Sequence, residues 1–153
     1  MLKLHQVIWS SALILSSPVT FAEELASEPA LAFTILDTQL KWGPCPAFIP
    51  PGCEIAVLHG DPAKANADIF FKVPADFTIP QHWHTSAERM VLVSGELRVT
   101  YDGQEPTTLQ PGTYAYGPAK LPHSAYCLKG TPCVLFIAFE APIDAMPIEN
   151  PTE

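Results

Sequence analysis

Residues 81–88 read Gln-His-Trp-His-Thr-Ser-Ala-Glu. On a β-strand successive side chains point to opposite faces, so His82 and His84 share one face while the tryptophan between them takes the other. Glu88 has the same parity and, across a short turn, can bring its carboxylate to the same point. Two neutral imidazoles and a carboxylate are ligands that divalent transition metals accept. The stretch therefore predicts three ligands of a metal site, and His123 is the candidate for the fourth.

Short apolar runs separated by turn residues surround this stretch. The chain contains 17 prolines and 8 glycines, and no long segment repeats at a helical period. Residues 96–101 alternate polar side chains with Leu97, Val99 and Tyr101, a pattern typical of a half-buried antiparallel strand. About eight to ten such strands predict one all-β domain, either a small barrel or a double-sheet roll.

The first 22 residues resemble a secretory signal peptide. A weakly basic start precedes the apolar run Val7–Leu15, and the small residue Ala22 ends the segment. We predict cleavage after Ala22 and a periplasmic or secreted protein; an N-terminal anchor that is retained is the alternative. The run is too short to span a bilayer comfortably.

The rest of the chain divides by composition into three parts. Residues 23–49 are expected to form an N-terminal arm and first strand, residues 50–140 the β-barrel, and residues 141–153 a C-terminal tail. Within the arm, residues 31–40 contain mixed apolar side chains and are expected to form either a strand or a short turn of helix.

The charge pattern excludes several classes of partner. The formal net charge is -8 and no cluster of Lys or Arg occurs, so nucleic acids and anionic membrane surfaces are poor partners. Arg89 and Arg98 have the wrong parity to face the interior of a barrel. A site for a dicarboxylate or a nucleotide sugar ordinarily carries an inward cation. We therefore expect a small substrate or ligand that is neutral or chelates the metal.

The four cysteines fit an exported protein. Of the three connectivities that four cysteines allow, the simplest joins Cys45 to Cys53 and Cys127 to Cys133, and each bridge would close a short loop. Cysteine thiolates as metal ligands are the alternative, but they would need a reducing compartment.

The histidine stretch resembles the first motif of the cupin superfamily, written G(x5)HxH(x3–4)E(x6)G. His82, His84, Glu88 and Gly95 match it at the expected spacings, whereas Asp76 stands where the motif begins with glycine.

The second cupin motif, G(x5)PxG(x2)H(x3)N, is similar to residues 112–127. Gly112, Pro118 and His123 match it, Lys120 replaces its second glycine, and Cys127 replaces its terminal asparagine.

The resemblance implies a small single-domain, exported bacterial cupin with an RmlC-like jelly-roll barrel. It implies one divalent transition metal ion (Fe, Mn, Zn, Ni or Cu) on His82, His84, Glu88 and His123. It also implies a homodimer, in which the segment before Cys45 is the natural swapping strand.

Three classes of function stay open at this point. The leading hypothesis is a metalloenzyme with dioxygenase-like chemistry, in which the substrate chelates the metal and Glu88 could also detach to act as a base. A lyase or isomerase would use the same four ligands. The competing classes are a non-catalytic metal- or ligand-binding module, such as a sensor, and an exported structural scaffold.

Parity also predicts which neighbours line the interior. Met90 and Leu92 should share the inner face with Glu88, while Val91 and Val93 lie outward. Tyr114 and Tyr116 share one parity, so they either wall the cavity or pack in an ordinary core.

Overall fold

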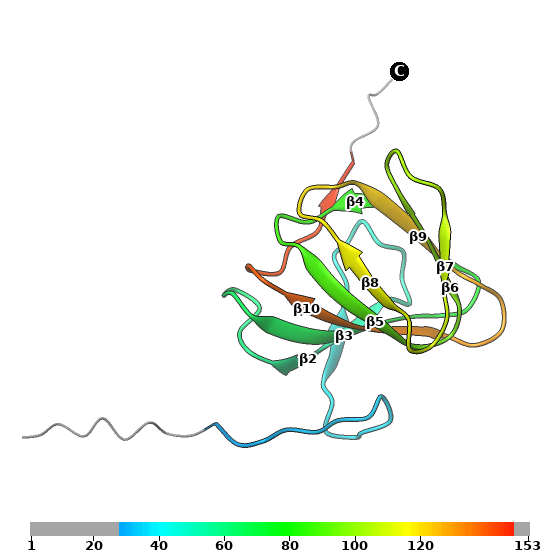
Figure 1. Ribbon diagram of the computed structural model, residues 1–153. Helices are drawn as coiled ribbons and strands as arrows, with labels where there is room; N and C mark the ends of the chain where they lie inside the picture. The colour runs from blue at the N-terminus through cyan, green and yellow to red at the C-terminus, as the bar shows by residue number, and fades with distance from the viewer. Residues whose placement is uncertain (1–27, 149–153) are drawn as a thin grey trace, which may run out of the picture. The chain divides into compact units, whose positions relative to one another are not determined.

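The described residues fold into β-strands joined by turns. The computed structural model describes residues 28–148; the predicted signal peptide, residues 1–22, lies outside them. Residues 32–148 belong to one structural unit (Figure 1). Its strands are β1 (Trp42–Pro44), β2 (Glu54–His59), β3 (Ala67–Val73), β4 (Phe77–Trp83), β5 (Glu88–Ser94), β6 (Leu97–Tyr101), β7 (Thr107–Leu109), β8 (Tyr114–Gly117), β9 (His123–Cys127), β10 (Cys133–Phe139) and β11 (Met146–Pro147).

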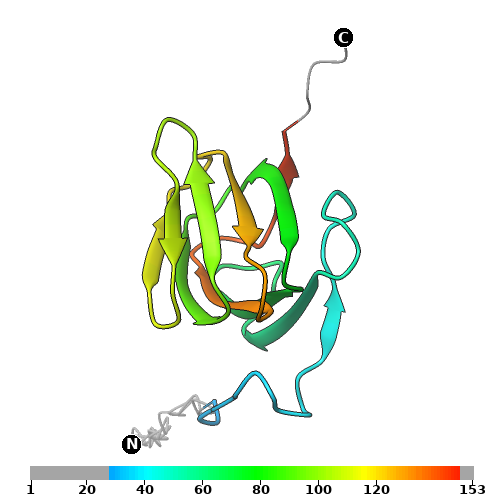
Figure 2. The ribbon, with the colours of Figure 1, turned by 90° about the vertical axis from the view of Figure 1, so that its right-hand side faces the viewer.

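The strands form two antiparallel sheets. One sheet has the order β1-β2-β3-β10-β5-β8, and the other has the order β11-β4-β9-β6-β7. Consecutive strands often lie in different sheets, so the chain crosses repeatedly between the two, as Figure 2 shows from the side. Because buried residues of both sheets join one hydrophobic cluster, the core lies between them. This arrangement confirms the predicted all-β jelly roll. In the described part of the chain, no helix has the length and apolar character needed to cross a bilayer.

Strand β5 shows how sequence alternation builds the core. Glu88, Met90 and Leu92 are buried, whereas the side chains between them are partly or fully exposed. The predicted inward positions of Met90 and Leu92 are therefore confirmed. Val93 is 38% exposed and Val91 is intermediate, in agreement with their predicted outward positions.

Neither interpretation of Tyr114 and Tyr116 is correct. They are 60% and 51% exposed on β8, which is an edge strand. The inward positions of β8 belong instead to Ala115 and Gly117, which pair with Met90 and Glu88 of β5. Alternation correctly predicts that the two tyrosines share a face, but a period-2 pattern does not say which face is inside.

Both predicted disulfides are present, Cys45–Cys53 and Cys127–Cys133. The second joins the end of β9 to the start of β10, and both of its cysteines are buried. Gly95, which closes the first motif, lies against this bridge at a φ of 81°. A Cβ built there would come within 2.8 Å of the Cys133 Sγ atom, so only glycine fits without displacing the bridge.

The two ends of the described unit both pair with inner strands. Residues 31–40, expected to form a strand or a turn of helix, contain turns and neither of these elements. The first strand is β1, which pairs with β2. At the other end β11 pairs with β4, where Pro147 lies opposite His82. The C-terminal segment therefore runs beside the histidine stretch.

Candidate metal centre

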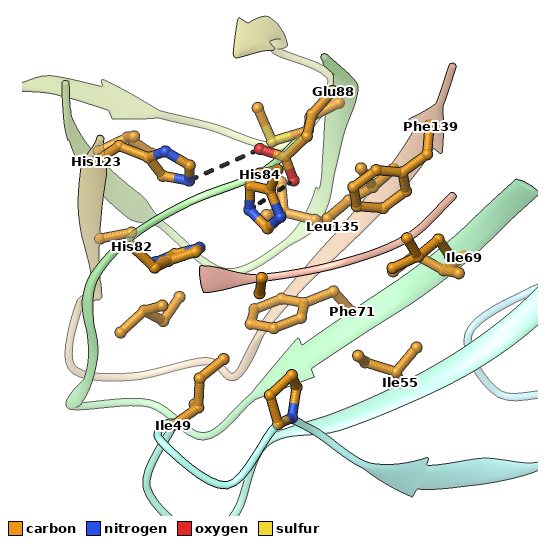
Figure 3. Close-up of a pocket in the computed structure, with 18 of the residues that line it drawn as sticks. Ile49, Ile55, Ile69, Phe71, His82, His84, Glu88, His123, Leu135 and Phe139 are labelled. Carbon is orange, nitrogen blue, oxygen red and sulfur yellow. Dashed lines mark ion pairs between the residues drawn. The ribbon is translucent and has the colours of Figure 1, made fainter. Parts of the chain in front are cut away.

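Three strands and one turn bring the four predicted ligands together. His82 lies on β4, His84 directly follows that strand, and His123 begins β9, where it pairs with His82. Glu88 begins β5 in the opposite sheet. Figure 3 shows the three imidazoles and the carboxylate pointing toward one another inside the barrel. All four residues are buried.

Backbone carbonyls orient each imidazole. A carbonyl can only accept a hydrogen bond, so each Nδ1 must be the protonated nitrogen. His82 Nδ1 donates to the Pro80 carbonyl at 2.7 Å, and His123 Nδ1 donates to the Leu121 carbonyl at 3.1 Å. His84 Nδ1 donates to the carbonyl of Asp144. The Nε2 lone pairs are thereby left free for a metal, and the possible ligand nitrogens of the three histidines lie within 4.8 Å of one another.

The Glu88 carboxylate completes the group. Its Oε1 is 3.4 Å from His84 Nε2 and its Oε2 is 3.7 Å from His123 Nε2. Two donors on one metal, each about 2.1 Å from it, lie about 3.0 to 3.5 Å apart at ordinary coordination angles. The 3.4 Å separation falls within that spacing and the 3.7 Å separation is slightly longer, so Glu88 is a candidate fourth ligand beside the three-histidine group.

Burial sets the protonation of these groups. Burial, with a further contribution from His123, lowers the pKa of His82 to about 3. Burial is also the main cause that lowers the pKa of His84, and it lowers that of His123 to about 4. Burial raises the pKa of Glu88 to about 8. Neutral imidazoles are the metal-binding form, and a buried carboxylate is stabilised by a bound cation, so this donor set fits a divalent transition metal.

The turn between His84 and Glu88 is held by Ser86, which is buried. Its Oγ donates to the Ala87 carbonyl at 2.7 Å and accepts from the backbone N–H groups of Glu140 and Ala141 at 2.9 and 3.0 Å. This hydroxyl ties the turn to the end of β10. It therefore fixes the point from which β5 starts and from which Glu88 enters the site.

The four residues border a small apolar cavity of about 140 Å³. Its walls are mainly aliphatic and aromatic side chains from both sheets, including Ile49, Ile55 and Phe71 (Figure 3). No Lys or Arg lines this cavity in the described residues. Arg89 pairs instead with Glu140 at the surface, as the parity of β5 predicts.

Two motif positions keep the backbone of the glycine they replace. Asp76 and Lys120 stand where the cupin motifs have glycine, and their φ angles are 60° and 63°. The Lys120 N–H donates to the His84 carbonyl at 2.8 Å, so its left-handed turn contacts the histidine stretch. The geometry of the motif is therefore preserved without the residue type that it favours.

Sequence reasoning missed two residues of the site, Tyr101 and Asp144. The Tyr101 ring lies 5.0 Å from the His123 ring, centroid to centroid, and both residues line the cavity. Burial, and then the nearby Glu88 charge, raise the pKa of Tyr101. Alternation places Tyr101 on the inner face of β6. Its position opposite His123 depends on the pairing of β6 with β9, which joins residues far apart in the sequence. Asp144 accepts from His84 Nδ1 through its backbone carbonyl, and its carboxylate accepts from the Thr85 N–H at 2.8 Å. Both contacts join residues about sixty positions apart, which local spacing does not predict.

The comparisons with known proteins agree with this fold and site. The cupin domain family matches residues 69–139, which include all four predicted ligands. Residues 69–139 of the chain therefore form a cupin domain. No curated protein sequence matches it.

Solved structures give the same fold. The DMSP lyase DddQ from Ruegeria pomeroyi aligns with a TM-score of 0.62 at 18% identity, over 74% of this chain and 64% of that one. The polyketide cyclase RemF from Streptomyces resistomycificus aligns with 0.61 at 17% identity, over 78% and 87%. An RmlC-like cupin from Shewanella frigidimarina aligns with 0.55 at 18% identity, over 67% and 86%. The chain spans less than two thirds of the lyase, and at these identities the likeness shows the fold alone.

Proposed function

We propose that this protein is a small cupin metalloenzyme that holds one divalent transition metal ion with His82, His84, Glu88 and His123. One observation carries the proposal: three neutral imidazoles direct their free Nε2 atoms to one point beside a buried carboxylate. Iron, manganese, zinc, nickel and copper all accept this donor set.

The cavity indicates the class of substrate. Its small volume and apolar walls favour a small molecule, and the absence of Lys and Arg from its described lining disfavours substrates held by their negative charge. We therefore propose a small substrate or ligand that is neutral or that chelates the metal with its own donor atoms. A bound metal would orient such a molecule and activate it for reaction with O₂, which makes dioxygenase-like chemistry the leading proposal.

A lyase or isomerase is the second candidate, and Glu88 favours it. Its carboxylate is buried and borders the cavity, so a Glu88 side chain that detaches from the metal could act as a general base toward a bound molecule. In this scheme Glu88 removes a proton from the substrate, and no oxidant is needed.

Metal analysis of the purified protein tests the shared premise. We expect about one transition metal ion per chain, and we expect His82→Ala to lose most of it. His59→Ala is the matched control because His59 is an exposed residue outside the cavity lining. If the His82→Ala variant keeps its full metal content, the ligand assignment is wrong.

Oxygen uptake separates the two enzymatic candidates. The metal-loaded protein is mixed with a panel of diketones, flavonols and thiols, and dissolved O₂ is followed together with product formation. Uptake with product supports the dioxygenase, whereas product without uptake supports the lyase or isomerase. Tight metal binding without turnover under any loading would contradict both and favour a non-catalytic binding or sensor module.

We further propose that residues 1–22 are a signal peptide and that the mature protein is periplasmic or secreted. The two disulfides support this location because such bonds persist in oxidising compartments. N-terminal sequencing of the protein from its own compartment should begin at Glu23. A protein that begins at Met1 would contradict cleavage.

The remaining proposals concern organisation. We propose residues 23–49 as the arm and first strand, 50–140 as the barrel, 141–153 as the tail, and a homodimer as the assembly. Sedimentation of the full mature chain, and of a variant shortened to begin at Gly43, tests the assembly. A dimer that depends on the arm supports it, and a monomer at micromolar concentration contradicts it.

A further inference from the structure

The Tyr101 hydroxyl stands out among the buried polar groups. Of the fully buried side-chain nitrogen and oxygen atoms in residues 28–148, it is the one without a hydrogen-bond partner. Leaving a buried hydroxyl unpaired costs about 1 to 3 kcal/mol. A phenylalanine would fill the same apolar space without that cost. Because no described residue hydrogen-bonds to this hydroxyl, a bound molecule is the candidate for its hydrogen-bond partner.

Its position places that partner in the cavity. Tyr101 pairs with His123 across β6 and β9, and it lines the cavity beside the candidate metal ligands. Gly117 of β8 lies against it: a Cβ built on that glycine would be 2.9 Å from the hydroxyl and 3.1 Å from Glu88 Oε2. The hydroxyl and the carboxylate thus border the same small space, which the missing side chain of Gly117 leaves open.

The other polar side chains of the cavity have no hydrogen left to offer. The three histidines already donate through Nδ1 to backbone carbonyls, and their Nε2 atoms carry lone pairs. A carboxylate that binds a metal is ionised, so Glu88 has no proton to donate in the metal-bound site, and the Asp144 carboxylate accepts from the Thr85 N–H. The polar side chains in the lining are His82, His84, Glu88, Tyr101, His123 and Asp144. Tyr101 is therefore the cavity side chain that can donate a hydrogen bond to an acceptor atom of a bound molecule.

We propose that the Tyr101 hydroxyl donates a hydrogen bond to an oxygen atom of the substrate bound at the metal centre. This inference rests on the proposed function and narrows its substrate class. The substrate is a small, neutral or enolisable molecule with two neighbouring oxygens, as in a diketone or a hydroxyketone. One oxygen or both bind the metal, and one accepts from Tyr101.

Binding of a small chelator to the Co²⁺-loaded full chain tests the inference without turnover. The probe is acetylacetone, which chelates through two oxygens, and its binding is followed by the change in the cobalt absorption bands. We expect Tyr101→Phe to keep its metal content but to bind acetylacetone about tenfold more weakly, as the loss of one hydrogen bond implies. Tyr114→Phe, which removes an exposed hydroxyl, should bind the probe unchanged.

A second probe separates this donor role from a general effect on the site. N,N,N′,N′-Tetramethylethylenediamine chelates through nitrogens that have neither an N–H group nor a free lone pair once bound. Its affinity should therefore be equal in the parent and in the Tyr101→Phe variant. Equal loss of affinity for both chelators, or unchanged affinity for acetylacetone, would overturn the inference. Loss of metal from Tyr101→Phe would also overturn it, because Tyr101 would then support the metal site. If the parent chain binds no metal, it is the proposed function that fails, and metal analysis reports this separately.

Discussion

Strand β9 has a different role at each of its two ends. At its start, His123 joins two other histidines and Glu88 around a cavity, and Tyr101 lies beside it. At its other end, Cys127 is fully buried and bonded to Cys133, next to Gly95. Both residues point inward by the same alternation. Strand β9 therefore carries a candidate metal ligand, His123, at one end and a disulfide-bonded cysteine, Cys127, at the other.

The two ends also differ in what their burial does to stability. The histidine end buries ionisable groups, and their desolvation opposes folding unless a metal or proton compensates. The disulfide end buries Leu92 and Leu97 almost completely and adds a covalent link. Changes at the histidine end should therefore alter metal binding more than stability, and changes at the disulfide end should do the reverse. The following predictions test this division, from the largest expected effect to the smallest.

At the histidine end, His123→Ala should reduce the metal content from about one ion per chain to nearly none. The metal-free variant should be as stable as the metal-free parent or more stable, because a desolvated imidazole is removed. Elemental analysis gives the first quantity, and urea unfolding in the presence of a chelator gives the second. A variant that loses stability without losing metal would assign His123 to the core rather than to the site.

At the disulfide end, Gly95→Ala should destabilise the fold by about 3 kcal/mol or more. The new Cβ would meet the Pro132 carbonyl oxygen at 2.7 Å and Cys133 at 2.8 Å, in a left-handed backbone conformation. Gly103→Ala is the matched control. Its φ is 75°, but nothing lies within 4 Å of the new atom, so about 1 to 2 kcal/mol is expected. Equal losses in urea unfolding would show that the bridge leaves room for a side chain.

Removal of the bridge itself should have the next largest effect. The double variant Cys127→Ala, Cys133→Ala should lose about 2 to 3 kcal/mol of unfolding free energy, the usual contribution of a short disulfide loop. It should keep its full metal content, since the bridge lies at the opposite end of β9 from His123. A large loss of metal in folded protein would show that the two ends are coupled.

The metal-free protein should lose stability as the pH rises from 6.5 to 8. The pKa of Glu88 is raised from 4.5 to about 8 by burial, so the folded state holds a proton that the unfolded state has released. That contribution is lost as the pH rises, by about 2 kcal/mol over this range. The pKa values of the three histidines are lowered on folding, and their unfolded forms still release protons up to about pH 7.5. Their contribution offsets roughly 1 kcal/mol of this loss, so the net decrease is below about 1 kcal/mol.

Glu88→Gln supplies the matched comparison for this pH effect. The amide does not titrate, so the histidines alone should make the metal-free variant more stable by roughly 1 kcal/mol between pH 6.5 and 8 in urea unfolding. A parent whose stability rises with pH as much as that of the variant would show that Glu88 is ionised in the metal-free fold.

The smallest effect is expected at Lys120, between the two ends. This exposed residue has a φ of 63°, which glycine adopts without a steric penalty. Lys120→Gly should change the unfolding free energy by less than about 1 kcal/mol, with a gain expected because relief of strain opposes the extra entropy of the unfolded chain. The metal content should stay unchanged. A clear loss of stability would mean that the lysine side chain, rather than its backbone, holds the turn.

The sequence predicted the parts of the molecule that depend on local spacing. Alternation placed Met90 and Leu92 inside, and the short separations of the cysteines indicated both bridges. The spacing of the motif residues predicted the fold, and the structure brings His82, His84 and His123 together.

Features of the site that depend on the pairing of distant strands could not be predicted from local spacing. Tyr101 enters the site because β6 pairs with β9, and Asp144 orients His84 through a carbonyl sixty positions away. The outward direction of Tyr114 and Tyr116 depends on the pairing of β8 with β5. Such pairings are set by how whole strands pack, and a period-2 pattern is equally compatible with either face.

A crystal structure of the metal-loaded protein, recorded at the absorption edge of its metal, tests the central claim most directly. The account predicts one anomalous peak inside the barrel, about 2.0 to 2.2 Å from the Nε2 atoms of His82, His84 and His123 and from a carboxylate oxygen of Glu88. A peak located elsewhere, or no peak between these four side chains after loading, would contradict it.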